Sequence, residues 1–393
     1  MNYMILVRSG VGKLAKCLRV GVVRLLMLAA VSFLATGSLC HAPEPSFEIE
    51  NISNNASFSQ SPCITCTKDG HVVIAWSDSA SGQENVWLVE KASPGSEWTA
   101  PFNVSKASEP SRDPSTAFGP DGTLHLAWSQ FVARGEVGGW VIVCQSRIGS
   151  QWTVAETISR GVSARPRLAV DGAGRLHLLF WNLSSDEVCY SSKAPESSWA
   201  QVQVLDKAYF EGQLAVDAAG RCYAAWNVDA DSLADFLCYS VKPVDGLWAS
   251  SKFVSGRGLM QSLPALACGD SNCYLGFSTL VAGSGLGLMR YKWGTGWSDL
   301  DTSCPSRTVN PLGLTIDADG CPVAVWGGVP AGLRVARKSG GWDVVTVSDT
   351  LNPFSRCCAA ADGLGNIHVV WDSRGTLYTA RPDVYYACIK WKK

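Results

Sequence analysis

Hydrophobic residues recur along this chain in short runs that are separated by tight polar turns. The clearest example is PRLAVDGAGRLHLLFW at 166–181. It predicts a strand over 167–170, a turn over 171–174 and a second strand over 176–181. Runs of this length, rich in Val, Leu, Tyr and Trp and bounded by Gly, Asp, Ser and Pro, are typical of β-strands. No amphipathic helical pattern follows residue 45, so we expect an all-β protein from there on.

Variants of this unit occur seven times. The aromatic residue that closes its second strand recurs every 45 to 52 residues, at Trp76, Trp128, Phe180, Trp226, Phe277, Trp326 and Trp371. A fixed period of this size indicates a repeat architecture. Each unit continues with a variable loop and a third hydrophobic run. A fourth run then opens with a tryptophan in six units, at Trp98, Trp152, Trp199, Trp248, Trp297 and Trp342. Four-stranded antiparallel units that repeat radially form a β-propeller, here with seven blades.

The two ends of the repeat region predict how the ring closes. The seventh unit stops after its third run, at 383–391, so its fourth strand is missing. A run at 46–53, SFEIENIS, precedes the first unit and resembles the fourth run WTVAETIS at 152–159. We expect 46–53 to complete the last blade, because closure removes exposed strand edges that would otherwise pair with other chains.

The N-terminal segment, residues 1–42, has a different character. Five basic residues precede the uncharged run LLMLAAVSFLA at 25–35, and small residues suited to cleavage follow. This pattern predicts a secretory signal peptide. The run is shorter than the ~20 residues of a membrane span, and an uncleaved anchor that tethers the protein to the membrane is the alternative. We therefore expect 43–393 to be a secreted or cell-envelope propeller, extracytoplasmic and monomeric.

Composition agrees with an all-β protein that has a large buried core, and the charge argues against one class of partner. Apolar residues make up 47% of the chain and charged residues 17%, with 16 Trp and 38 Gly. The net charge is −1 and no basic stripe is present. Nucleic-acid binding needs clustered Lys and Arg that neutralise phosphates, so we expect no nucleic-acid partner.

The chain has 15 cysteines, and the 13 that follow the N-terminal segment cannot all pair. Cys268 and Cys273 flank one turn and are placed to form a disulfide. A bridge between Cys66 and Cys358 would join the first and last blades. Most other cysteines lie in strand runs, as small buried hydrophobic residues do. Cys63-x-x-Cys66 has no second pair at ligand spacing, so we predict no metal site and no cofactor.

Strand alternation places the variable loops and the links between blades on one face of the propeller. Loops on a rigid scaffold commonly carry function. The candidate ligand-binding residues from the loops are Asp78, Asp372 and Arg374, and those from the links are Arg112, Asp113, Arg165 and Arg356. The three link arginines enter first strands at similar levels, so we expect them to converge on an anion at the mouth of the central channel.

A recurrent histidine occupies one position of the second strand in three units, at His125, His177 and His368. These positions are spread round the ring, close to the opposite face. We therefore expect a structural hydrogen bond to the neighbouring blade, repeated by symmetry, in place of a shared ligand site.

The repeat PRLAVDGAGRLHLLFW, together with WDSR at 371–374, resembles the bacterial neuraminidase-repeat, sialidase-like β-propeller superfamily. The resemblance covers 46–393 and implies a propeller. That superfamily includes sialidases, other exo-acting glycosidases, polysaccharide lyases and propeller lectins. Its Asp-box is reduced here to forms such as KSGGW at 338–342. A sialidase also needs a Tyr nucleophile activated by Glu, and Tyr209 and Glu211 share one link without matching the motif. No catalytic role is carried over.

These observations lead to one expected function and two alternatives. We expect an exported, non-catalytic propeller that binds carbohydrate or another cell-surface ligand on the variable-loop face. The first alternative is a sialidase-like exo-glycoside hydrolase or polysaccharide lyase that uses the arginines with an acid from Asp78, Asp113 or Asp372. The second is a protein-interaction scaffold in the cell envelope.

Overall fold

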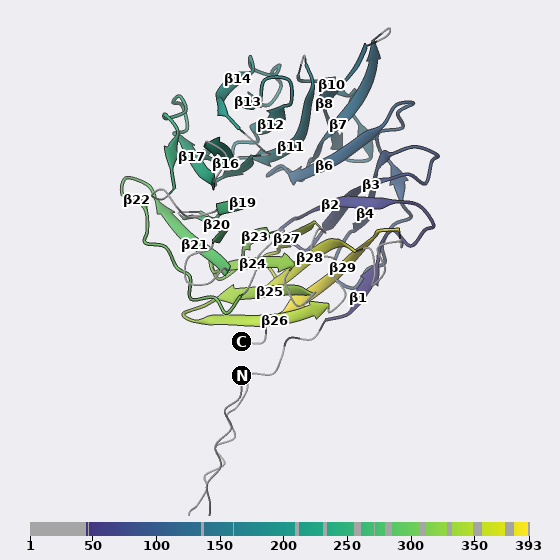
Figure 1. Cartoon of the computed structure of the whole chain (residues 1–393). Helices are drawn as coiled ribbons and strands as arrows, with labels where there is room; N and C mark the ends of the chain where they lie inside the picture. Colours follow the sequence, from purple (N-terminus) through teal and green to yellow (C-terminus); the bar gives the residue numbers. More distant parts are fainter. Residues whose placement is uncertain are drawn as a thin grey trace, which may run out of the picture. The chain divides into compact units, whose positions relative to one another are not determined.

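The strands predicted for each repeat pair into antiparallel sheets that stand round a ring (Figure 1). This computed structural model describes residues 45, 47–134, 137–159, 161–208, 212–230, 234–254, 261–270, 272–279, 285–306, 312–327, 332–348, 356–373 and 381–391. These residues form seven sheets of four strands, one of which has an additional short strand. The prediction of a seven-bladed all-β propeller is confirmed.

The blades follow one another along the chain. Blade 1 contains β2 (Ser59–Cys66), β3 (Val72–Asp78), β4 (Asn85–Lys91) and β5 (Phe102–Asn103). Blade 2 contains β6 (Ser111–Phe118), β7 (Leu124–Arg134), β8 (Val137–Ile148) and β10 (Glu156–Thr157), with β9 (Gln151–Trp152) also paired to β8. Blade 3 contains β11 (Ser163–Val170), β12 (Leu176–Asn182), β13 (Glu187–Lys193) and β14 (Gln203–Lys207). Blade 4 contains β15 (Gln213–Val216), β16 (Cys222–Ala230), β17 (Ala234–Lys242) and β18 (Lys252–Phe253).

The remaining blades repeat this order. Blade 5 contains β19 (Gln261–Cys268), β20 (Cys273–Thr279), β21 (Gly285–Lys292) and β22 (Gly296–Trp297). Blade 6 contains β23 (Leu312–Ile316), β24 (Pro322–Gly327), β25 (Leu333–Lys338) and β26 (Trp342–Ser348). Blade 7 contains β27 (Cys357–Ala361), β28 (Asn366–Ser373), β29 (Asp383–Lys390) and, from the other end of the chain, β1 (Ile49–Asn51).

Strand β1 closes the ring, as the sequence predicts. It pairs antiparallel with β29, so that Ile49 lies opposite Ala387 and Asn51 opposite Tyr385 (Figure 1). The paired segment is shorter than the predicted 46–53. Ile52, directly after β1, is 8% exposed and packs into the cluster between blades 7 and 1. Both main-chain pairing and apolar packing therefore hold the two ends of the propeller together.

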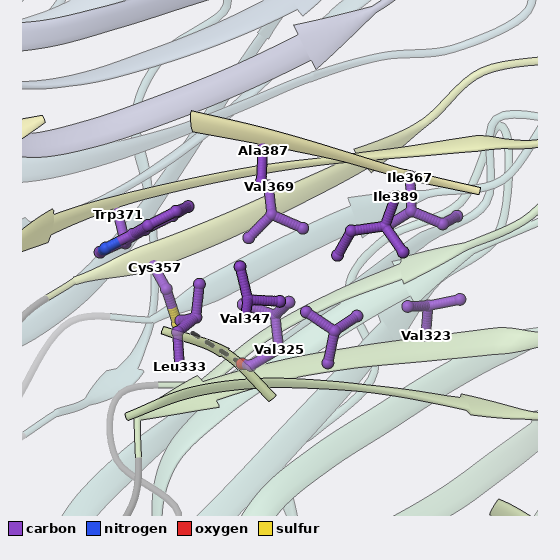
Figure 2. Close-up of a cluster of buried hydrophobic side chains, with 11 residues drawn as sticks. Val323, Val325, Leu333, Val347, Cys357, Ile367, Val369, Trp371, Ala387 and Ile389 are labelled. Atoms are coloured by element: carbon purple, nitrogen blue, oxygen red, sulfur yellow. Dashed lines mark hydrogen bonds between the residues drawn. The ribbon is translucent and has the colours of Figure 1, made fainter. Parts of the chain in front are cut away.

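The hydrophobic core lies between neighbouring blades. Every residue of β3 is buried, which requires contacts on both faces of that blade. Figure 2 shows one such layer, in which Val323 and Val325 of blade 6 face Val369 and Trp371 of blade 7. The repeat aromatics are among the most buried side chains: Trp76, Trp128, Trp226, Phe277, Trp326 and Trp371. The aromatic period in the sequence thus marks the packing layer that joins one blade to the next.

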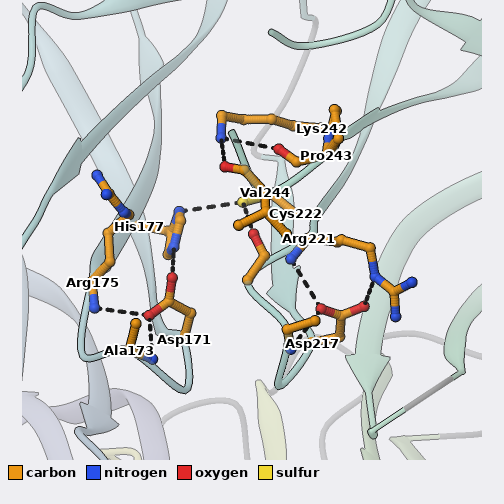
Figure 3. Close-up of polar contacts among 12 residues, drawn as sticks. Asp171, Ala173, Arg175, His177, Asp217, Arg221, Cys222, Lys242, Pro243 and Val244 are labelled. Atoms are coloured by element: carbon orange, nitrogen blue, oxygen red, sulfur yellow. Dashed lines mark hydrogen bonds and ion pairs between the residues drawn. The ribbon is translucent and has the colours of Figure 1, made fainter. Parts of the chain in front are cut away.

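The Asp-x-x-Gly turns between first and second strands are held by a buried hydrogen-bond network (Figure 3). Asp171 Oδ1 accepts bonds from the backbone N–H groups of Ala173 and Arg175, while Oδ2 lies 3.2 Å from His177 Nε2. His177 Nδ1 lies 2.8 Å from the Tyr190 hydroxyl of the same blade. Burial lowers the pKa of His177, which favours the neutral ring. His177 therefore has a structural role in this turn.

The neighbouring blade contributes to this network less than the sequence suggested. Cys222 Sγ of blade 4 lies 3.2 Å from His177 Nδ1, so one of the histidine contacts crosses between blades. His125 Nδ1 instead lies 2.7 Å from Ser146 Oγ in its own blade. His368 lies beside Asp362 and Tyr386, also in its own blade. The expected hydrogen bond to the next blade is therefore wrong as a general rule.

One of the two suggested disulfides is present. Cys268 and Cys273 are bonded across the turn of blade 5. Neither Cys66 nor Cys358 is disulfide-bonded, so the suggested bridge between blades 1 and 7 is wrong. The register explains why. Cys358 lies opposite Val370, next to Trp371, whereas Cys66 lies opposite Val72, four residues before Trp76. The two cysteines therefore lie at different levels along their first strands.

The expected signal peptide, residues 1–42, lies outside the described residues, as do Arg374, Tyr209 and Glu211. The described part of the chain contains no long apolar helix of the kind that spans a membrane.

Candidate functional site

The first strands enter the channel mouth through a bulge at the variable-loop face. Ser61, Asp113 and Arg165 each precede a proline and have positive φ angles of 53°, 54° and 57°. The pairing with the second strand shifts register at each of these points. Left-handed backbone is unfavourable for a residue with a Cβ, so the surrounding structure must hold it. The three residues thus occupy equivalent positions at the mouth in consecutive blades.

Side chains at the end of a second strand in the preceding blade hold these bulges. Ser77 Oγ accepts a hydrogen bond from the Asp113 N–H at 3.1 Å, and Ser129 Oγ accepts one from Arg165 N–H at 3.0 Å. Asp372 Oδ2 accepts the Ser61 N–H at 2.9 Å. Its Oδ1 accepts the Arg356 N–H at 2.6 Å. The buried carboxylate of Asp372 therefore fixes the backbone on both sides of the junction between blades 7 and 1.

Asp78 has a comparable anchoring position. Its side chain is 1% exposed and accepts hydrogen bonds from Trp76 Nε1 at 2.8 Å and Ser59 Oγ at 2.7 Å. Asn55 Nδ2, Ser57 Oγ and the Ala80 N–H also donate to it. A carboxylate with this many donors is well satisfied without a ligand. The structure thus places Asp78 beneath the loop surface, where it organises the segment that leads into blade 1.

Two of the three link arginines converge on a carboxylate of the protein itself. Asp113 Oδ2 lies 3.7 Å from Arg112 Nε, and its Oδ1 lies 3.5 Å from Arg356 Nη1. Asp113 is buried, whereas the side chain of Arg112 is 39% exposed. Arg165 is half-buried in the next blade. The structure therefore brings Arg112, Asp113 and Arg356 together as a charged cluster at the mouth.

Glu84 adds a second carboxyl group that the sequence analysis missed. Gln60 Nε2 donates a hydrogen bond to Glu84 Oε1 at 3.0 Å, and the Glu84 carbonyl accepts the Ser111 N–H. Burial raises the pKa of Glu84, and the charge of Asp113 raises it further, against the opposing effect of Gln60 and Arg112. Glu84 lies at the end of the variable loop between β3 and β4. In the sequence, only its position in a variable loop could have marked Glu84 as a candidate, because the residues that surround it come from other strands.

An aromatic side chain completes the exposed part of the cluster. The guanidinium carbon of Arg112 lies 3.9 Å from the centre of the Trp140 ring. Trp140 also packs edge-on against Phe131, with ring centres 5.6 Å apart. Both aromatic residues belong to β7 and β8, whose 11 and 12 residues make them the longest of the described strands. The hairpin therefore carries an aromatic surface beside the charged cluster.

Below the mouth, the first strands line a cavity of about 200 Å³ in the central channel. Each blade contributes one first-strand residue to this lining at an equivalent position. In every blade that residue is paired with the second-strand residue directly before the repeat aromatic. These residues are Cys63, Ser115, Arg167, Gln213, Ala265, Gly313 and Cys358. Arg167 was not among the predicted site residues. Its Nε donates to Gln213 Oε1 at 3.2 Å and its Nη1 to the Pro166 carbonyl at 3.1 Å.

No group of three or more His, Cys, Asp or Glu side chains is arranged to hold a metal ion among the described residues. Burial raises the pKa of Cys63 and of Cys66 to about 12, so both thiols stay protonated at neutral pH. Protonated thiols are poor metal ligands and poor nucleophiles. These two half-buried cysteines thus behave as small hydrophobic residues.

Comparisons with known proteins agree with the fold. No protein-family model and no curated protein sequence matches the chain. The structure is similar to a protein of unknown function from Dyadobacter fermentans, with a TM-score of 0.55, 12% identity and coverage of 89% of this chain and 100% of that one. It is similar to the polysaccharide lyase Uly1, with a TM-score of 0.56, 12% identity and coverage of 85% and 90%.

A third similar structure is the β-propeller domain of the Trilobed protease from Pyrococcus furiosus, with a TM-score of 0.53 and 10% identity. It covers 84% of this chain and 95% of that domain. Identities this low show a shared fold and carry no activity with them. The resemblance to sialidase-like propellers is therefore supported for the fold alone.

Proposed function

We propose that this protein is an exported, non-catalytic β-propeller that binds carbohydrate through the charged and aromatic cluster at its channel mouth. The observation that carries the proposal is the half-exposed guanidinium of Arg112, which stacks on Trp140 beside Asp113, Glu84 and Arg356. Binding sites commonly combine aromatic surfaces with a few well-placed polar groups. A sugar offers both an apolar face and hydroxyl groups that match such a surface. Another cell-surface ligand with the same features would also fit.

Two further facts support the ligand class and the location. The similar structures include the polysaccharide lyase Uly1, so this fold is compatible with recognition of a polysaccharide. The Cys268–Cys273 disulfide is typical of proteins from oxidising compartments. Together with the signal-like sequence of residues 1–42, it supports export to the cell surface or the medium.

Catalysis is the second candidate, and the Glu84–Asp113 pair favours it. Burial raises the pKa of Glu84, while Asp113 lies between two arginines. Two carboxyl groups in contrasting environments are a common basis for acid–base catalysis. A sialidase-like exo-glycoside hydrolase or polysaccharide lyase would use Glu84 as the acid, because Asp78 and Asp372 already serve the backbone and loop contacts described above.

The test is retention of the purified protein on a glycan array that includes neutral, sialylated and uronic-acid sugars. We expect selective retention, and a loss of about tenfold or more in affinity for Trp140→Ala and Arg112→Ala. The matched control is Trp293→Ala, because Trp293 is 38% exposed but follows β21 at the opposite face. Disappearance of the glycan epitope during incubation, abolished by Glu84→Gln, would establish the catalytic candidate instead. An array without any retained glycan would contradict both.

A further inference from the structure

The central channel is lined by two arginines and, among its described lining residues, by no acidic side chain. Arg167 enters from blade 3 and Arg356 from blade 7. The rest of the lining consists of proline, cysteine, small and aliphatic residues with Gln213, Ser115 and Thr116. A cavity with low-dielectric walls concentrates the field of its charged groups, so the two guanidinium groups favour an anion over a cation there.

The Cys63 thiol in the lining carries no negative charge that would offset the two arginines. Cys63 faces the cavity at the same level as Arg167, and burial raises its pKa to about 12. The thiol is therefore neutral at physiological pH. The carboxylate of Asp113 contacts Arg356 at 3.5 Å from above, outside the residues that line the cavity.

Arg167 is held in place by its neighbours in a way that suits recognition of an anion. Its Nε is bound to Gln213 and its Nη1 to the Pro166 carbonyl, so the planar group has a fixed orientation. Guanidinium groups bind carboxylate, sulfate and phosphate with charge-assisted hydrogen bonds. A volume of about 200 Å³ admits an ion of this size together with water, which occupies about 30 Å³ per molecule in the liquid.

We propose that the central channel is a binding site for a small oxyanion, held between Arg167 and Arg356. The shared ligand chemistry is a carboxylate, sulfate or phosphate group. It comes either from a free ion or from an acidic substituent of a glycan whose remainder lies at the mouth. The free-ion form is independent of the proposed carbohydrate function and survives its failure.

The experiment is calorimetric titration of the purified chain with sulfate, phosphate, acetate and glucuronate at constant ionic strength set with chloride. We expect saturable binding that weakens about tenfold or more in Arg167→Gln and in Arg356→Gln, because each removes a charge-assisted hydrogen-bond donor. Arg290→Gln is the matched control, since Arg290 is an exposed arginine at the outer part of blade 5. It should bind as the unmodified protein does.

The outcomes separate the sources of the anion. Binding of sulfate or phosphate alone supports the site with a free ion as ligand. Binding of glucuronate but not of inorganic ions supports it with the group carried by a sugar. Absence of saturable binding for all four probes overturns the proposal, and so does equal binding by Arg167→Gln and Arg290→Gln. If Arg167→Gln fails to fold by circular dichroism, Arg356→Gln and the charge-retaining Arg167→Lys decide the question.

Discussion

At the scale of single residues, carboxylates of the same type have different tasks because their neighbours differ. Asp78 is buried under five donors, and Asp372 accepts two backbone N–H groups at the junction of the first and last blades. Asp113 lies between two arginines. Glu84 has one amide donor and is desolvated. In the sequence Asp78, Asp113 and Asp372 were equivalent candidates, and only their surroundings in the structure distinguish them.

The raised pKa of Glu84 predicts how its effect on stability depends on pH. The folded state holds this proton more tightly than the unfolded state, where a Glu pKa is about 4.3. The free energy of unfolding therefore decreases as the pH rises from the unfolded-state pKa to the folded-state pKa. We expect Glu84→Gln to raise the melting temperature relative to the unmodified protein at pH 7, and to raise it less at pH 4.

The control for this measurement is Glu97→Gln, which changes an exposed carboxyl group in the turn between the third and fourth runs of blade 1. Because this side chain is exposed, Glu97→Gln should change the melting temperature little. A difference for Glu84→Gln that is equal at pH 4 and pH 7 would show that burial does not raise the Glu84 pKa.

At the scale of elements, the fourth strands differ most from the prediction. The sequence placed a tryptophan at the start of the fourth run in six units. The fourth strands β22 and β26 include that residue, whereas β5, β10, β14 and β18 begin after it. Trp98 shows the reason. Its ring packs edge-on against Tyr386 of blade 7, with centres 5.0 Å apart, and its Nε1 donates to Glu50 of β1 at 2.9 Å. The tryptophan fills a space between blades, and pairing with β4 resumes only beyond it.

The closing strand provides a sharp test at this scale. Ile52 is 8% exposed at the junction of blades 7 and 1, whereas Ile49 in the same segment is 45% exposed. A carboxylate forced into the apolar junction has no partner there and should cost about 3 kcal/mol. We expect Ile52→Asp to lower the free energy of unfolding by that amount in urea denaturation followed by tryptophan fluorescence.

Ile49→Asp is the matched control and should change the free energy of unfolding by less than about 0.5 kcal/mol. Equal effects of the two substitutions would mean that packing at the ring junction contributes nothing specific to stability.

At the scale of the whole molecule, the hydrophobic clusters couple each blade to its neighbours. One cluster joins blades 6 and 7, and another joins blades 7 and 1. Open repeat arrays can unfold from their ends, because each unit contacts only its neighbours. A ring closed by β1 has no terminal blade of that kind. We therefore infer that the propeller unfolds as one cooperative unit.

Buried thiols distributed round the ring can report on this cooperativity. Cys144, Cys189, Cys238 and Cys357 lie in blades 2, 3, 4 and 7 and are all buried. Burial raises the pKa of Cys144 and Cys238 to about 12 and that of Cys189 to about 11. We expect these thiols to resist iodoacetamide in the native protein at pH 8, because the thiolate is the reactive form.

In increasing urea, all four cysteines should become labelled over the same concentration range, measured by mass spectrometry of their peptides. The disulfide-bonded Cys268 and Cys273 should stay unlabelled throughout and serve as the internal control. Labelling that begins at one blade well before the others would contradict unfolding as a single unit.

The sequence by itself determined the first three strands of each blade, the number of blades, the closing segment at the N-terminus and the disulfide in blade 5. These follow from local information: the alternation of apolar residues, the chemistry of the turns, the repeat period and the short spacing of Cys268 and Cys273. Tertiary structure decided the arrangement of the candidate site. It placed Asp113 between Arg112 and Arg356, set Trp140 against Arg112, brought Glu84 to Gln60 and directed Arg167 into the channel. It also separated Cys66 from Cys358. Each of these outcomes depends on the depth and direction of side chains from different strands, which packing between blades sets and no local pattern encodes.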